Sequence, residues 1–196
     1  MAEVELPNPE ELEERRDKAF SRRVALVTAI YAVVLAIASL GGNNAMKEML
    51  IAQQEASNQW AYYQSKVIRE HLNRGNKVML ETQLADPSAL KGAEREKFEA
   101  LAKKFGDEEK RMVVDKKEIE PKARAFEAER DRNQTKDPYF DYAEVLLQIS
   151  IVCASVSILS TSRPMFWFSS ILAILGALST MNGFLLFFRL PFLHGH

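Results

Sequence analysis

The hydrophobic residues of this chain are concentrated in three stretches without charge, which are separated by a long charged region. These stretches are Val24–Leu40, Val145–Ser162 and Pro164–Phe188. A helix needs about 17–25 residues to cross a hydrocarbon core of roughly 30 Å. The alternative is that the short stretches are core helices of a soluble bundle, but such helices carry a charged outer face and these carry none. The pattern therefore predicts three transmembrane helices.

The segment before Val24 predicts the orientation. Asn8-Pro9-Glu10-Glu11 is a typical helix start. Five cations follow it and place the N-terminus in the cytoplasm under the positive-inside rule: Arg15, Arg16, Lys18, Arg22 and Arg23. The acidic beginning lacks the basic region of a cleavable signal peptide, so we expect the first stretch to remain as an anchor.

These spans divide the chain into six predicted parts. We expect a cytoplasmic N-terminal segment with a short helix (1–23), a first transmembrane helix (24–42), an extramembrane helical hairpin (43–137), a second (138–162) and a third (163–189) transmembrane helix, and a tail (190–196). In a bacterium the hairpin would then lie in the periplasm. If the first short span fails to insert, the hairpin is cytoplasmic instead and the basic segment lies along the membrane surface.

The middle region has the pattern of long solvated helices. Its 19 basic and 19 acidic residues between Ala45 and Tyr142 are interspersed, which is not the pattern of a nucleic-acid surface. Hydrophobic residues recur every seven positions, as in a supercoiled helix. The predicted seam consists of Phe98, Phe105, Met112, Ile119 and Phe126, facing Trp60, Tyr63 and Val67. We expect Pro121 to bend its helix.

Turn signals at Gly75-Asn76 and Asp86-Pro87-Ser88 mark the tip of an antiparallel, coiled-coil-like hairpin. Trp60 lies 20 residues beyond Leu40, about 30 Å along a helix, which is too far for an aromatic belt at the membrane surface. Counting back a similar distance from Pro138 predicts that Trp60 packs near Ile119. The fold class is thus an all-α membrane protein with three transmembrane helices and an extramembrane hairpin.

Small side chains recur at helical spacing in each span. They let helix backbones approach closely in lipid, either within one subunit or between subunits. The predicted packing residues are Ala25, Ala29, Ala32 and Ala36 in the first span, Ser150, Ala154 and Ser157 in the second, and Ala173, Gly176, Thr180 and Gly183 in the third.

The sequence supports two further predictions, which concern polar and aromatic residues near the outer ends of the spans. Gln148 and Asn182 lie at similar depth and are expected to hydrogen-bond each other, with a polar constriction of a pore as the alternative. In the Asp-Pro-Tyr-Phe-Asp-Tyr stretch, Asp137 and Pro138 are expected to open a helix. Tyr139, Phe140 and Tyr142 would then lie at headgroup depth.

Motifs for catalysis are absent from the sequence. It contains no glycine-rich phosphate loop, no paired Cys or His spacing typical of a metal site and no nucleophile elbow. Cys153, the only cysteine, lies inside a span and is expected to be a packing residue. His194 and His196 could contact a metal, but the favoured prediction is a frayed tail. The prediction is a protein that is not an enzyme and binds no cofactor or metal.

Two stretches, "NNAMKEMLIAQQEASNQWAYYQSKVIREHL" and "DPYFDYAEVLLQISIVCASVSILS", resemble the bacterial membrane-protein family called domain of unknown function 4337. The resemblance implies a bacterial membrane protein with the same three-span plan. It implies no activity.

Together these features lead to a functional hypothesis. We expect a protein of the bacterial inner membrane that self-associates into a homo-oligomer and acts as a scaffold or partner-binding platform, since a thin hairpin seam buries few side chains alone. The alternatives are a subunit of an oligomeric channel and an accessory subunit of a larger membrane complex. The expected partners are a second copy, the lipid bilayer and possible membrane proteins, but no nucleic acid.

Overall fold

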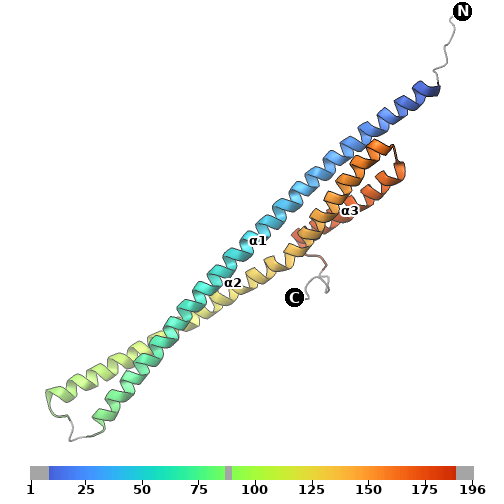
Figure 1. Cartoon of the computed structure of the whole chain (residues 1–196). Helices are drawn as coiled ribbons and strands as arrows, with labels where there is room; N and C mark the ends of the chain where they lie inside the picture. The colour runs from blue at the N-terminus through green and yellow to red at the C-terminus, as the bar shows by residue number, and fades with distance from the viewer. Residues whose placement is uncertain (1–8, 87–89, 189–196) are drawn as a thin grey trace, which may run out of the picture. The chain divides into compact units, whose positions relative to one another are not determined.

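A computed structural model describes residues 9–86 and 90–188, and the described chain consists of three α-helices without a strand (Figure 1). These are α1 (Pro9–Leu84), α2 (Ala93–Ser160) and α3 (Arg163–Leu185). Contacts divide the chain into two compact units. Unit 1 comprises Met1–Glu48 and Arg132–His196, and unit 2 comprises Met49–Asp131. The predicted tail, 190–196, lies outside the described residues.

The helices are longer than the turn signals predict. α1 begins at Pro9, as its first residues indicate, but it has no boundary at residue 23 and no turn at Gly75-Asn76. α1 ends at Leu84, just before the second predicted turn signal, Asp86-Pro87-Ser88. Gly92 has a positive φ of 56°, and its carbonyl accepts the first hydrogen bond of α2 from Glu96.

Two prolines, Pro121 and Pro138, lie inside α2. The helix continues through Pro121 and Pro138, so the expectation that Pro138 opens a new helix is wrong. A proline in a helix removes one hydrogen bond and costs about 3 kcal/mol. Packing offsets this cost at Pro138, because Tyr139 and Phe140 directly after it are both buried.

Unit 1 is held together by small residues and hydroxyl groups. Ser150 of α2 and Ser169 of α3 are fully buried and bond reciprocally, each hydroxyl donating to the other's backbone carbonyl at 2.9 and 2.8 Å. Tyr31 connects α1 to α3 through a 2.9 Å hydrogen bond to the Ser170 hydroxyl. Such bonds satisfy polar groups where water is absent.

Glycines set how closely the helices of unit 1 approach. A Cβ atom added at Gly183 would lie 2.9 Å from the Phe140 ring, and one at Gly41 would lie 2.5 Å from it. At Gly176 the added atom would lie 2.8 Å from Leu147 and 3.2 Å from the Ala143 carbonyl oxygen. Larger side chains at these positions would therefore force the helices apart.

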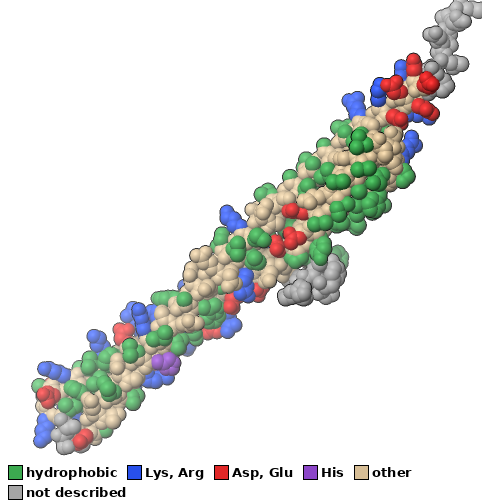
Figure 2. Space-filling view, in the orientation of Figure 1, with side chains coloured by type: hydrophobic (Ala, Val, Ile, Leu, Met, Phe, Trp, Pro, Cys, Tyr) green, Lys and Arg blue, Asp and Glu red, His purple; other side chains and the backbone are tan. Residues whose placement is uncertain are grey.

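Each of the three helices contains a stretch long and apolar enough to cross a membrane, which indicates a membrane protein. Figure 2 shows hydrophobic side chains covering the visible face of α3 and the adjoining part of α2, whereas acidic and basic side chains are interspersed over unit 2. The large apolar residues exposed on unit 1 include Leu26, Ile30, Val33, Ile174 and Leu178.

Candidate functional site

The centre of unit 2 is an interhelical cluster of charges. Lys66 of α1 is only 7% exposed, and its ammonium donates a 2.7 Å hydrogen bond to Asp115 of α2. The bond to Asp115 raises the pKa of Lys66 and lowers the pKa of Asp115. This cation is therefore fixed between the two helices, although its charge suggests a solvated surface position.

Glu70, one turn further along α1, forms ion pairs with two cations. Its carboxylate forms an ion pair with Lys116 of α2 and another, at 3.1 Å, with Arg74 of its own helix. Arg74 also donates a 2.7 Å bond to Glu109 of α2. Hydrogen bonding to Lys116 is the main cause that lowers the Glu70 pKa, while Glu109 raises the pKa of Arg74. Charges of opposite sign thus alternate across the interface.

The aromatic residues of unit 2 lie against this cluster. Trp60 donates a 2.8 Å hydrogen bond from Nε1 to Glu127 and contacts Tyr63 edge to face at 5.5 Å. Cations from α2 lie near both rings, Arg124 at 5.9 Å from Trp60 and Lys116 at 5.8 Å from Tyr63. The rings therefore take part in holding α1 to α2.

The predicted register between the helices requires a correction. The count places Trp60 near Ile119, but its partners are Arg124 and Glu127, five and eight residues further along α2. The count assumed that Leu40 and Pro138 lie at the same level. In unit 1, however, Gly41 lies against Phe140, so the starting points are offset.

The predicted seam residues are buried to different extents. Met112 and Ile119 are buried, while Trp60, Tyr63, Val67, Phe98, Phe105 and Phe126 are half-buried. Ala56 and Ala102, which follow the same hydrophobic spacing, are buried as well, whereas the sequence interpretation missed the small buried residues Ala52 and Ala123 and the charge cluster. The available signal was opposite charge at inward positions of the two helices, because Lys66 and Glu70 on α1 face Asp115 and Lys116 on α2.

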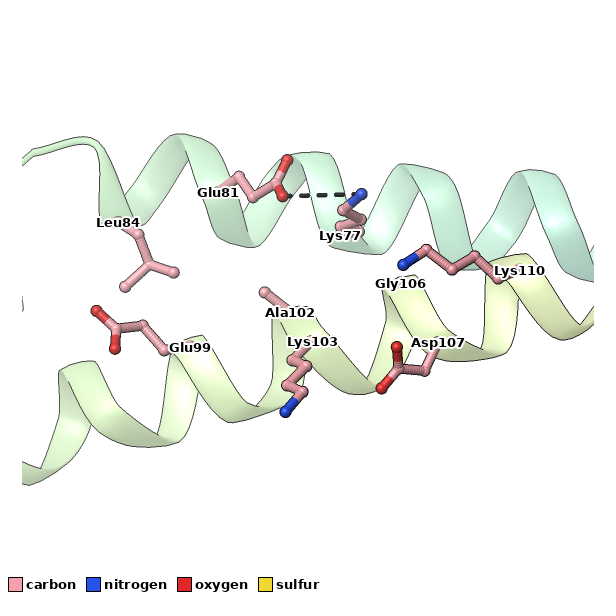
Figure 3. A pocket seen from close by; sticks show the side chains of 9 residues that line it. All are labelled: Lys77, Glu81, Leu84, Glu99, Ala102, Lys103, Gly106, Asp107 and Lys110. Carbon is pink, nitrogen blue, oxygen red and sulfur yellow. Dashed lines mark ion pairs between the residues drawn. The ribbon is translucent and has the colours of Figure 1, made fainter.

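An open groove of about 320 Å³ lies near the end of α1. Leu84 and Ala102 lie between the two helices there, and charged side chains surround them (Figure 3). Lys77 and Glu81 form a 3.9 Å ion pair along the edge. Within 9–86 and 90–188, no three His, Cys, Asp or Glu side chains are grouped so that they could hold a metal ion.

A second apolar stripe follows the outer face of α1 in unit 2. Its large members are Ile68, Leu72 and Met79, which are 67%, 62% and 55% exposed. The exposed Ala61 and Gly75 and the half-buried Ser65 complete the stripe, so its spacing alternates between four and three residues. This is the spacing of a coiled-coil core. A second core face on the same helix indicates a surface for another helix.

The predicted small residues of the spans differ in burial. The predicted residues of α2 and α3 are all buried: Ser150, Ala154, Ser157, Ala173, Gly176, Thr180 and Gly183. In contrast, Ala25, Ala29, Ala32 and Ala36 of α1 are exposed within one chain. α1 instead packs through Val24, Ala38, Gly41 and Ala45, with Tyr31, Val34 and Leu35 partly buried. The Phe140 and Leu147 side chains of α2 pack against this face of α1.

Gln148 and Asn182 are not joined. The Asn182 amide binds Phe188, donating to its carbonyl at 2.8 Å and accepting from its backbone N–H at 2.9 Å. Asn182 thereby closes the C-terminal end of α3, where free backbone groups provide nearer partners. Gln148 is exposed on α2.

The aromatic residues expected at headgroup depth also differ from one another. Tyr139 and Phe140 are each only 2% exposed and point into unit 1, whereas Tyr142 is exposed. The Tyr139 hydroxyl donates to the Phe188 carbonyl at 2.9 Å, and the Phe140 ring meets Phe184 edge to face at 5.0 Å. Because Gly41 and Gly183 have no side chains, there is space for the Phe140 ring to point inward.

Comparison with known proteins gives one match. The family model described as "Domain of unknown function (DUF4337)" matches residues 20–186. No curated protein matches the chain, and no solved structure does.

Proposed function

The chain belongs to the DUF4337 family, a domain of unknown function, and we propose that it is a membrane-anchored scaffold that self-associates through α1. We further propose that it resides in the bacterial inner membrane with a cytoplasmic N-terminus and unit 2 in the periplasm. The exposed stripe Ala61–Met79 carries this proposal.

Unit 2 has the features of an antiparallel, coiled-coil-like hairpin. Partner positions on α2 decrease as positions on α1 increase, from Trp60 with Glu127 to Arg74 with Glu109. The inner seam between the two helices uses one face of α1. Apart from the half-buried Ser65, the stripe consists of residues that this seam leaves exposed, so a further helix can pack there without separating the pair.

A second copy of the chain fits this stripe. Copies inserted in one membrane have the same orientation, so their α1 helices run parallel and the stripe can meet itself in register. The flanking positions would then pair Gln64 with Arg69 of the second copy and His71 with Asn76 of the second copy. Neither pair places like charges together.

Gln148 supports association inside the membrane as well. It is exposed on α2 among the exposed apolar residues Val145, Ile149 and Val152. An amide facing lipid costs free energy, which a hydrogen bond to a neighbouring subunit removes. The exposed Ala25–Ala36 face of α1 offers a close approach at another part of the span.

The test is the native mass of the detergent-extracted protein with substitutions in the stripe. We expect a discrete homo-oligomer for the parent chain and a monomer for the Ile68→Glu/Leu72→Glu variant, because charges would be buried at the contact. Val114→Glu is the matched control, since Val114 is an exposed apolar residue of α2 outside the stripe. A monomer for the parent chain at micromolar concentration would refute the proposal.

Cross-linking in native membranes tests the parallel register. In a Cys153→Ser background, we expect Ile68→Cys to form a disulfide-linked dimer under mild oxidation and Val114→Cys to form none. Equal cross-linking by the two variants would show that α1 is not the contact.

A further inference from the structure

Unit 1 contains a second pocket, which lies where the apolar stretch of α1 ends. Its volume is about 180 Å³, and residues of all three helices line it. Gly41 and Ala45 on α1 are small and buried, so they leave room for the pocket. The buried Phe140 and the half-exposed Phe184 provide aromatic walls.

The polar lining of this pocket carries both signs of charge. Glu48 and Asn44 of α1 and Lys136 of α2 line it. Among residues 9–86 and 90–188, neither Glu48 nor Lys136 has an ion-pair partner, although both line the same pocket. The Lys136 ammonium donates one hydrogen bond, of 2.9 Å, to the Asn133 side chain. A cation and an anion that do not neutralise each other are complementary to a ligand that carries both charges.

The position of the pocket indicates a lipid. Gly41 directly follows the last residue of the apolar stretch Val24–Leu40, and Asn44 lies only about 5 Å beyond it along the helix. This distance corresponds to the headgroup layer, which extends the roughly 30 Å core to about 40–45 Å. One turn towards the middle of the stretches, Ile37 on α1 and Met181 on α3 are exposed and apolar. They offer a surface for an acyl chain.

We propose that this pocket binds the headgroup of a zwitterionic phospholipid with a primary ammonium group, that is, phosphatidylethanolamine. The phosphate accepts hydrogen bonds from Lys136 and Asn44, and the ammonium donates to the Glu48 carboxylate. The acyl chain lies along Phe184 and the apolar residues beyond it. Phosphatidylcholine has no N–H group to donate to Glu48, and phosphatidylglycerol has no cation.

The experiment is lipid titration of the full chain, delipidated in mild detergent, with bound lipid counted by native mass spectrometry. Phosphatidylethanolamine, phosphatidylcholine and phosphatidylglycerol with identical acyl chains are compared. We expect phosphatidylethanolamine to bind about fivefold more tightly than phosphatidylcholine, the gain typical of one accessible charged pair. Equal affinity for the two lipids would overturn the proposal.

Two variants assign the charges separately. Glu48→Gln should remove the preference for phosphatidylethanolamine over phosphatidylcholine, whereas Lys136→Gln should weaken all three lipids because they share the phosphate. Glu129→Gln and Lys104→Gln, which change exposed residues of unit 2, should alter neither result. A preference that persists in Glu48→Gln would contradict the assignment.

A soluble competitor distinguishes a lipid from a free headgroup. O-phosphoethanolamine at the lipid concentration should leave the bound lipid in place, since it lacks the acyl chain that contacts the apolar surface. Displacement as strong as that by the lipid itself would show a site for the free headgroup and overturn the lipid assignment.

Discussion

The two units join helices by opposite means. In unit 1 the contacts between helices are made by neutral residues, among them glycine, alanine, the aromatic ring of Phe140 and reciprocally hydrogen-bonded serines. In unit 2 the same helices, α1 and α2, are joined by ion pairs beside a thin apolar seam. Apolar side chains gain little from contact in lipid, so close backbone approach holds helices there. In water, burial of apolar residues and charge pairing both contribute.

The largest expected effect comes from glycine. Gly176→Ala should lower the free energy of unfolding by about 1–3 kcal/mol, because its Cβ would lie 2.8 Å from Leu147 and 3.2 Å from a backbone oxygen. Gly106→Ala is the control, since its Cβ would lie 3.5 Å from the flexible Lys77 side chain. This change should stabilise α2 by about 0.5–1 kcal/mol. Helical circular dichroism on heating measures both, and equal midpoints would contradict the role of Gly176.

Lowering the pH should destabilise unit 2 more than unit 1. The pKa values of Glu70 and Asp115 are lowered from their ordinary values of 4.5 and 3.8, so both carboxyls bind fewer protons in the folded state. Their stabilisation is present above those ordinary values and is lost as the pH falls through the folded pKa values. We expect hydrogen exchange, corrected for intrinsic rates, to show protection lost in unit 2 and kept in unit 1. Parallel loss in both units would contradict the comparison.

Removing one charge should have a smaller effect. Glu70→Gln leaves Lys116 without its partner and should destabilise unit 2 by about 1–2 kcal/mol, below the value for a deeply buried pair because only two helices surround it. Glu99→Gln is the control, since Glu99 pairs with Arg95 on an exposed face, and it should change stability by less than about 0.5 kcal/mol. Urea unfolding followed by tryptophan fluorescence compares them, and a similar loss in both variants would argue against the cluster.

The smallest expected effect concerns Trp60. Trp60→Phe keeps an aromatic ring but removes the hydrogen bond to Glu127, which should cost about 1 kcal/mol. Trp167→Phe should leave stability nearly unchanged, because Trp167 is 68% exposed. The thermal unfolding midpoints of the two variants test this difference. A larger decrease in the midpoint for Trp167→Phe than for Trp60→Phe would contradict a stabilising role of the Trp60 hydrogen bond.

Sequence periodicity predicted the elements of this fold better than their ends and contacts. Uncharged length alone identifies three helices able to span a membrane, because that property is local. The same rules fail at Gly75 and Pro138, where packing elsewhere in the chain outweighs the local preference for a turn or a helix start.

The candidate surfaces were only partly predictable. Hydrophobic spacing identified Met112 and Ile119, which are buried. It did not reveal that Lys66 and Glu70 face inward, since a charge at an inward position is favourable only if its partner on the other helix is known. Likewise, the inward position of Phe140 depends on glycines about a hundred residues earlier and forty residues later in the chain.

This arrangement of Phe140 among glycines has a genetic consequence. The ring occupies space that exists only because positions 41 and 183 lack side chains, so the three positions are not free to vary independently. A larger residue at position 183 should become tolerable once position 140 carries a smaller one, as in Gly183→Ala combined with Phe140→Leu. In related sequences, size at position 140 should therefore vary inversely with size at positions 41 and 183, and such compensated pairs would mark chains that share this packing.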